Sequence, residues 1–118
     1  MIKKYEEFVN KLQTATDKRT ITWEKASVND EYQAMIGNNS VSIKYQPAMD
    51  LFITGGKSKP NVSLQIHNKD GERIDDISAE NDDLGYPALR KLYESARRAC
   101  NKVEETIDEM LAVLEATS

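Results

Sequence analysis

The sequence predicts a single α+β domain, in which an N-terminal helix precedes a five-stranded antiparallel meander and one long C-terminal helix. Apolar residues recur every three or four positions near both ends of the chain, which is typical of amphipathic helices. Between these segments, apolar and polar residues alternate in short runs separated by turn residues, which is typical of strands. The chain has 118 residues, which suits one domain spanning residues 1–118.

The first helix is expected over residues 2–16, where the apolar stripe consists of Ile2, Tyr5, Phe8, Val9 and Leu12. The last helix is expected over residues 87–116 as one uninterrupted rod, because no glycine or proline follows Pro87. Its apolar stripe runs from Leu89 to Leu114. At 1.5 Å per residue this rod would be roughly 45 Å long, more than strands of roughly 20 Å can cover.

Five strands are expected between the helices, over residues 20–26, 31–37, 40–46, 62–66 and 73–78. Short turns join most of them, so neighbours in the chain are expected to pair antiparallel. Both helices are expected on the one apolar face of the sheet, with Ile74 pointing inward from the last strand. The opposite face is expected to be solvated and to carry Gln33, Met35, Ser42, Gln65 and His67, among other residues.

Four segments of this meander and one of the last helix form a familiar pattern. They are Ile21–Trp23, Tyr32–Gly37, Val41–Ile43, Val62–Ile66 and Leu89–Arg98. Taken in chain order, these five segments resemble a loose set of short, uncharacterised bacterial and phage proteins. Those proteins share a tryptophan-containing first strand, a meander and a helix rich in leucine, tyrosine, alanine and arginine. The resemblance implies the same order of elements and a prokaryotic or phage source. It implies no activity, so it assigns no functional residues.

Charge and cysteine content limit the classes of partner and the compartment. The formal net charge is −4, whereas nucleic-acid-binding proteins usually present a net basic face, so nucleic acid is not expected as a partner. Cys100 is the only cysteine, which fits a reducing compartment, and a cytoplasmic location is expected. Two lysines followed by acids at the N-terminus do not match a signal peptide, and no apolar run reaches the length of a membrane span.

The residue types and their spacing predict neither an enzyme nor a bound cofactor or metal. The single histidine, His67, is 33 positions from Cys100, so a nucleophile–base pair or a zinc set is not expected. Residues 55–58 are similar to the end of a phosphate-binding loop but lack its first glycine and its following helix, so a turn is expected. The acidic residues of 70–83 lack the spacing of an EF-hand, which favours a solvated loop, with adventitious calcium binding as the alternative.

Two apolar segments are the candidate interfaces. The connection over residues 47–61 is longer than an ordinary hairpin loop, and its apolar residues could form either a contact element or a local lid on the sheet. The far end of the last helix stays apolar beyond the length that the sheet can cover, which indicates an interface. The candidate interface residues are Met49, Leu51, Phe52, Ile53, Ile107, Met110, Leu111 and Leu114.

These segments favour a non-catalytic protein-interaction or regulatory module, with an unidentified protein or a second copy of the chain as its partner. The expected homodimer is symmetric and uses the far end of the last helix, with Phe52 and Ile53 as additional candidates. The alternative is a small-ligand-binding domain, in which the sheet and the 47–61 loop enclose a pocket walled by Trp23, Tyr32 and Tyr45.

Overall fold

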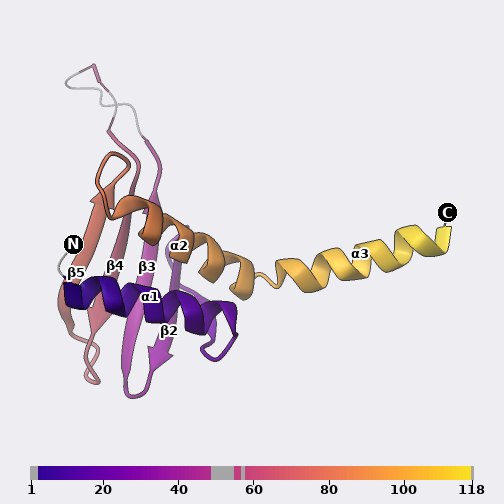
Figure 1. The fold of residues 1–118 in the computed structure, drawn as a ribbon, viewed down its shortest axis with the longest axis horizontal. Helices are drawn as coiled ribbons and strands as arrows, with labels where there is room; N and C mark the ends of the chain where they lie inside the picture. The colour runs from indigo at the N-terminus through magenta and orange to yellow at the C-terminus, as the bar shows by residue number, and fades with distance from the viewer. Residues whose placement is uncertain (1–2, 49–54, 57, 118) are drawn as a thin grey trace.

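Helices on one face of an antiparallel sheet form the body of the molecule (Figure 1). The computed structural model describes residues 3–48, 55–56 and 58–117. Its elements are α1 (Lys3–Asp17), β1 (Trp23–Lys25), β2 (Glu31–Ile36), β3 (Asn39–Gln46), β4 (Asn61–His67), β5 (Arg73–Glu80), α2 (Tyr86–Cys100) and α3 (Val103–Thr117). The α+β class, with an N-terminal helix before a five-stranded antiparallel sheet, is confirmed.

The strands pair in chain order, β1-β2-β3-β4-β5, and every pairing is antiparallel, so the expected meander is confirmed. The tightest connection joins β2 to β3, where Ile36 pairs with Asn39 across a two-residue loop. Gly37 in this loop has a φ of 64°, a conformation that hairpin turns require and that glycine adopts without a steric penalty. The turn between β4 and β5 is closed by the Asn68 side chain, which accepts hydrogen bonds from the backbone N–H groups of Asp70 and Glu72, each at 3.0 Å.

The hydrophobic core lies between this sheet and the first two helices. Figure 1 shows α1 and α2 over the same face, and α2 contacts all five strands, so its axis crosses the strands. The buried apolar side chains are Val9, Leu12, Trp23, Tyr32, Ala34, Val41, Ile43, Val62, Leu64, Ile77, Ala79, Leu89, Leu92, Tyr93 and Ala96. The helices are linked at the edge of this core by a hydrogen bond of 2.8 Å from Gln13 Nε2 to Ser95 Oγ.

Trp23 ties α1 to the first strand. Its side chain is only 4% exposed, which confirms that it is a core residue. The indole Nε1–H donates to Thr16 Oγ1 at 2.9 Å, and the Thr16 hydroxyl donates to the Leu12 carbonyl at 2.7 Å. The buried indole and hydroxyl groups are therefore both satisfied, so the large apolar area of Trp23 is buried without leaving an unpaired donor.

The expected uninterrupted helix over residues 87–116 is wrong. α2 ends at Cys100 and α3 begins at Val103, with Lys102 between them at a φ of 52°. The width of the sheet gives the physical reason. Five strands are roughly 19 Å wide, and a helix of 15 residues is about 22 Å long, so α2 has crossed the whole sheet when it reaches Cys100.

The expectation that Ile74 points inward is also wrong, because Ile74 is 62% exposed. A β-bulge shifts the register at this end of β5: Ile66 pairs with Asp75, and His67 pairs with Arg73. Ile74 is the extra residue and has no cross-strand partner. Farther along the strand, Ile77 and Ala79 supply the inward side chains instead.

The outer face of the sheet is covered by none of the described helices (Figure 1). It is polar, and Gln33 and Met35 are exposed there as expected. Ser42 differs from the expectation, because it is only 6% exposed. Ser42 lies on β3, the central strand of the sheet, between its cross-strand neighbours Gln33 and Gln65. Both neighbours have longer side chains than serine.

Replacing Trp23 by alanine should lower the free energy of unfolding by about 3–5 kcal/mol, because a large buried side chain is lost and a cavity remains. Trp23→Phe keeps an aromatic ring but removes the Nε1–H donor to Thr16, so a smaller loss of about 1–3 kcal/mol is expected. Urea unfolding of both variants measures these differences. A wild-type urea midpoint for Trp23→Ala would contradict the placement of this residue in the core.

Tyr93 is a buried titratable residue of the core. It is 2% exposed, and its ring lies 5.8 Å from that of Tyr32 and 5.5 Å from that of Tyr45. Burial raises the pKa of the Tyr93 hydroxyl, and the nearby Asp30 carboxylate, which accepts its hydrogen bond at 3.3 Å, raises this pKa further. The neutral phenol is therefore strongly preferred in the folded chain.

Folding stability should fall as the pH rises above about 10, where an unfolded tyrosine loses its proton and the folded Tyr93 retains it. Because the pKa of Tyr93 is raised in the folded chain, the stability that the neutral phenol contributes is complete below about pH 10. It is lost as the pH rises through the pKa of the folded state. Urea midpoints of the wild type and of Tyr93→Phe, compared at about pH 9 and about pH 11, test the effect. The midpoint of the variant should fall less, and an equal fall in both proteins would show that Tyr93 is not the responsible group.

Candidate interaction helix

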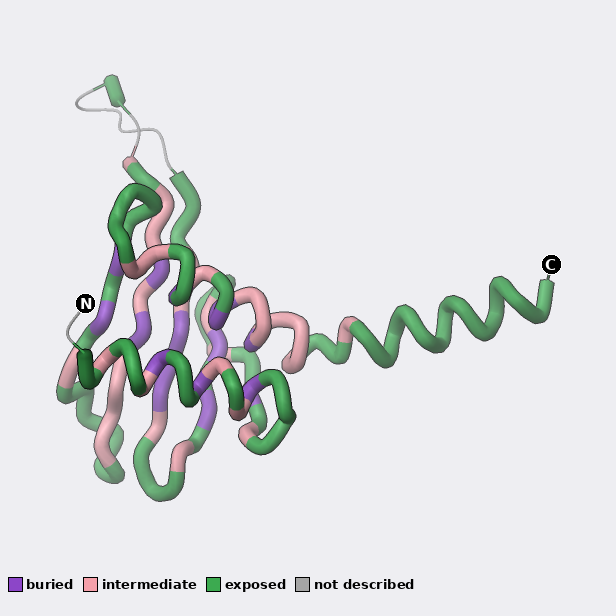
Figure 2. Tube along the Cα trace, in the orientation of Figure 1, coloured by how far each residue is buried: buried purple, intermediate pink, exposed green. Residues whose placement is uncertain are grey.

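α3 is the part of the described chain that no other element covers. It projects from the body (Figure 1), and every residue from Glu104 to Thr117 is exposed along its whole length (Figure 2). This projection increases the radius of gyration to 16.7 Å, whereas a compact chain of this length would have about 13 Å. α3 therefore contributes almost nothing to the core of its own chain.

The exposed surface of α3 is nevertheless apolar along one side. Nine large apolar residues are exposed in the described part of the chain, and five of them lie on α3: Ile107, Met110, Leu111, Val113 and Leu114. Ile107, Met110, Leu111 and Leu114 follow the spacing i, i+3, i+4 and i+7, so they form one stripe, here called the α3 stripe. These four residues were predicted as an interface from the sequence, and the structure brings them together on one helix face.

The first turn of α3 is held to the body by two ion pairs. Arg98 of α2 bonds to Glu104, and Arg19, which follows α1, lies 3.0 Å from Glu105. With 100° of rotation per residue, Glu105 lies on the side of α3 opposite the α3 stripe. The body is therefore attached to the back of α3 through Glu105 and to one flank of its first turn through Glu104, whereas the residues of the α3 stripe are exposed.

Charge separates α3 from the rest of the molecule. It contains five acidic residues and no basic residue, a formal charge of −5. The remaining residues carry 15 acidic and 16 basic side chains, a net charge of +1. The net negative charge of the whole chain is therefore accounted for by its projecting helix.

An isolated helix with these properties is marginal in water. Helices of about 12–15 residues gain too little from propagation to offset nucleation, and α3 has 15 residues. Glu104 and Glu105 in the first turn favour the helix through its dipole, but Glu115 near the end opposes it. Most helices in proteins gain their stability by burying an apolar face, whereas the residues of the α3 stripe are exposed.

The other predicted interface residues, Met49, Leu51, Phe52 and Ile53, lie outside the described residues. Val113 was not singled out in the sequence, although it is exposed beside the stripe. The spacing could have identified it, because Val113 lies three positions after Met110 and directly before Leu114.

The aromatic residues expected to wall a ligand pocket are part of the packed core instead. Trp23 and Tyr32 are buried beneath the helices. Tyr45 is covered by the Arg90 guanidinium, whose Cζ lies 3.8 Å from the ring centroid. Arg90 is held in place by Glu94, at 2.9 Å, so this stack closes the rim of the core.

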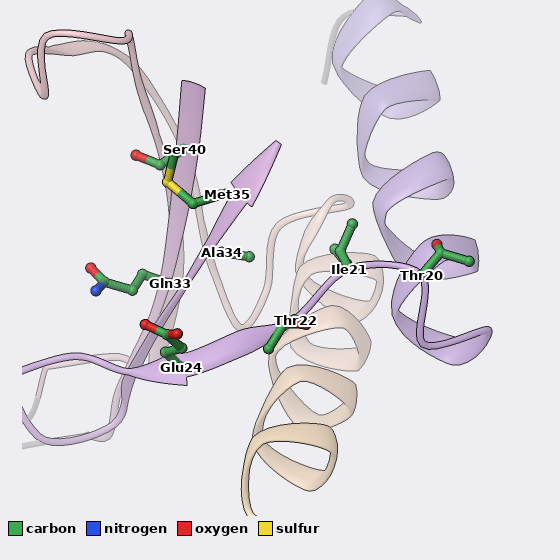
Figure 3. Close-up of a pocket in the computed structure, with 8 residues that line it drawn as sticks. All are labelled: Thr20, Ile21, Thr22, Glu24, Gln33, Ala34, Met35 and Ser40. Carbon is green, nitrogen blue, oxygen red and sulfur yellow. The ribbon is translucent and has the colours of Figure 1, made fainter. Parts of the chain in front are cut away.

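A hollow of about 420 Å³ lies at the β1 edge of the sheet, where β2 extends beyond the last pair, Trp23 with Ala34 (Figure 3). Its lining residues are Thr20, Ile21, Thr22, Glu24, Gln33, Ala34, Met35 and Ser40. Ligand pockets bury most of a bound molecule between apolar walls. Here Glu24, Gln33 and Met35 are exposed, so this hollow is a weaker candidate than the α3 stripe.

His67 and Cys100, the residues considered for a catalytic pair or a zinc site, lie on different elements. His67 is at the end of β4, paired with Ser40 and Arg73, whereas Cys100 is half-buried at the end of α2. Within the described ranges, no group of three or more His, Cys, Asp or Glu side chains is arranged to hold a metal ion. None of the helices described is long and apolar enough to cross a membrane.

Comparisons of the chain with models of protein families, with curated proteins and with solved structures found no match. The resemblance to bacterial and phage proteins therefore stays a prediction.

The conformation of Lys102 allows a test of the junction between α2 and α3. At a positive φ, glycine avoids the steric cost of a Cβ atom, so Lys102→Gly should be more stable than Lys102→Ala by about 1 kcal/mol. In a continuous helix the order reverses, because glycine is about 1 kcal/mol worse than alanine. Thermal unfolding of the two variants distinguishes these cases, and a more stable alanine variant would contradict the break between the helices.

Proposed function

We propose that this chain is a non-catalytic protein-interaction module and that α3 is its contact element. The observation that supports this proposal is the exposed α3 stripe, on a helix that the described residues of its own chain do not cover. Binding would bury the stripe and stabilise a helix that is marginal alone. The spacing i, i+3, i+4, i+7 is the pattern with which amphipathic helices present anchor side chains to a partner.

Over residues 3–48, 55–56 and 58–102, the body provides no apolar stripe to which α3 could return. Outside α3, the exposed large apolar residues of the described chain are Val28, Met35, Ile74 and Leu84. Met35 and Ile74 lie on different strands, and Val28 and Leu84 lie in two different connections, so the four residues form no stripe that matches that of α3. A partner from outside the chain is therefore favoured over an internal docking site.

The proposal extends to compartment and source in the sense predicted from the sequence. The chain has a single cysteine, so no disulfide is expected within it, which fits the reducing cytoplasm. A bacterial or phage origin rests on the resemblance described above. Small-ligand binding is the less favoured function, because its expected aromatic wall is occupied by core packing.

Photocrosslinking inside cells that express the chain tests this function. A photoreactive phenylalanine analogue at Leu111 would lie on the α3 stripe, whereas the same analogue at Ala112 would lie on the back of the helix. Discrete crosslinked products are expected from position 111 and not from position 112. Equal products from both positions, or no product from position 111, would show that α3 is not a contact element.

A further inference from the structure

The occupant of the α3 stripe can be inferred from the arrangement of residues around it, on the basis of the proposed function. We propose that α3 binds the α3 helix of a second copy of this chain, in parallel, about a two-fold axis that runs along the two helices. The proposal rests on three features: the heptad positions of the stripe, the distribution of acids on its two sides, and the side on which the body is attached.

The apolar residues of α3 fit a short heptad repeat. Ile107 and Leu114 occupy a positions, and Val103 and Met110 occupy d positions, with spacings of four, three and four residues. This a/d seam is the pattern with which two helices pack side by side. Leu111 at an e position and Val113 at a g position widen the seam and would be covered at its margins.

The acidic residues distinguish parallel from antiparallel pairing. One flank of the stripe carries Glu104, Asp108 and Glu115, whereas the opposite flank carries Thr106, Val113 and one acid, Glu109. In a parallel pair, the e flank of each helix lies beside the g flank of its partner, so the flank with three acids meets the flank with one. In an antiparallel pair, the two acidic flanks would lie on the same side and repel each other.

The attachment of the body leaves room for this pairing. The ion pair between Arg19 and Glu105 places the body on the back of α3, and the ion pair between Arg98 and Glu104 touches the e flank only in the first turn. In a parallel pair the two bodies would be at the same end of the seam. They would lie on opposite sides of the two-fold axis, each behind its own helix, so they do not compete for the same space.

Salt distinguishes a second copy from a basic partner protein. Each α3 carries a charge of −5, so pairing of two copies brings like charges together, and salt should strengthen it by screening that repulsion. Binding of the same acidic helix to a groove lined by lysine or arginine would weaken with salt. The sign of the salt dependence is therefore opposite for the two occupants.

Analytical ultracentrifugation of the full chain tests the self-association. The dimer fraction should rise between about 10 and about 500 µM protein by mass action. At a fixed concentration it should also rise between about 0.05 and about 0.5 M NaCl. A chain that is monomeric at about 500 µM in the higher salt, or a dimer that dissociates as salt is added, overturns the proposal.

Two variants with the same added charge provide the matched control. Leu114→Glu places a carboxylate in the seam and should weaken the dimer at least about tenfold, because a charge would be desolvated there. Ala112→Glu places the same carboxylate on the back of α3 and should change the dissociation constant less than about threefold. Equal effects of the two variants overturn the proposal. Trp23 fluorescence, which reports on the core of the body, shows that both bodies remain folded.

Crosslinking tests the parallel orientation in a Cys100→Ala background. In a parallel pair, Ile107 of one copy faces Ile107 of the other, so Ile107→Cys should be joined rapidly by a short thiol crosslinker, and Ala112→Cys should not. If Ile107→Cys is joined only when mixed with Leu114→Cys, the pairing is antiparallel and the stated geometry is wrong. Equal yields at positions 107 and 112, or none at either, also overturn it.

These results separate the proposal from the function on which it rests. Photocrosslinks from position 111 to proteins of another mass, together with a monomeric chain in the ultracentrifuge, would retain the interaction module and reject the second copy. Photocrosslinked products of twice the mass of the chain, formed by a chain that self-associates, would support both.

Discussion

The contact between α2 and the inner face of the sheet is the interaction on which the rest of the structure depends. Leu89, Leu92, Tyr93 and Ala96 are all buried there, and α2 touches every strand. Because α2 crosses the strands, the width of the sheet limits the length of helix that it can cover. The chain beyond Cys100 is still helical but has no sheet beneath it. The exposure of α3 is thus a consequence of the sheet having five strands and not more.

Most of the fold could be predicted from local patterns, because the period of the apolar residues changes clearly between helix and strand. Turn residues such as Gly37 then specified which strands are neighbours. Two details could not be predicted in this way. The bulge that exposes Ile74 depends on the register between two strands, and the break at Lys102 depends on where the sheet ends. Neither glycine nor proline marks that break, so local sequence gave no signal for it.

The candidate site could be predicted in part for a related reason. Ile107, Met110, Leu111 and Leu114 are recognisable because helical periodicity continues after the expected cover is exhausted. Their lack of any cover within the chain is tertiary information, and it required the course of α3 relative to the body. The need for tertiary information also explains why Trp23, Tyr32 and Tyr45 were expected to wall a ligand pocket in the alternative function. Alternation placed them on one face, but only the positions of α1, α2 and Arg90 show that this face is filled.

The position of the only tryptophan has a practical consequence for studies of this chain. Trp23 reports on the core of the body, whereas α3 contains no aromatic residue and lies outside that core. The three helices of the described residues have 15 residues each, so one third of their helical signal comes from a segment that tryptophan fluorescence does not sense. Because α3 has so few contacts with the body, α3 can unfold while the body stays folded. Fluorescence and circular dichroism curves will therefore not coincide, and a single two-state fit describes the body but not the whole chain.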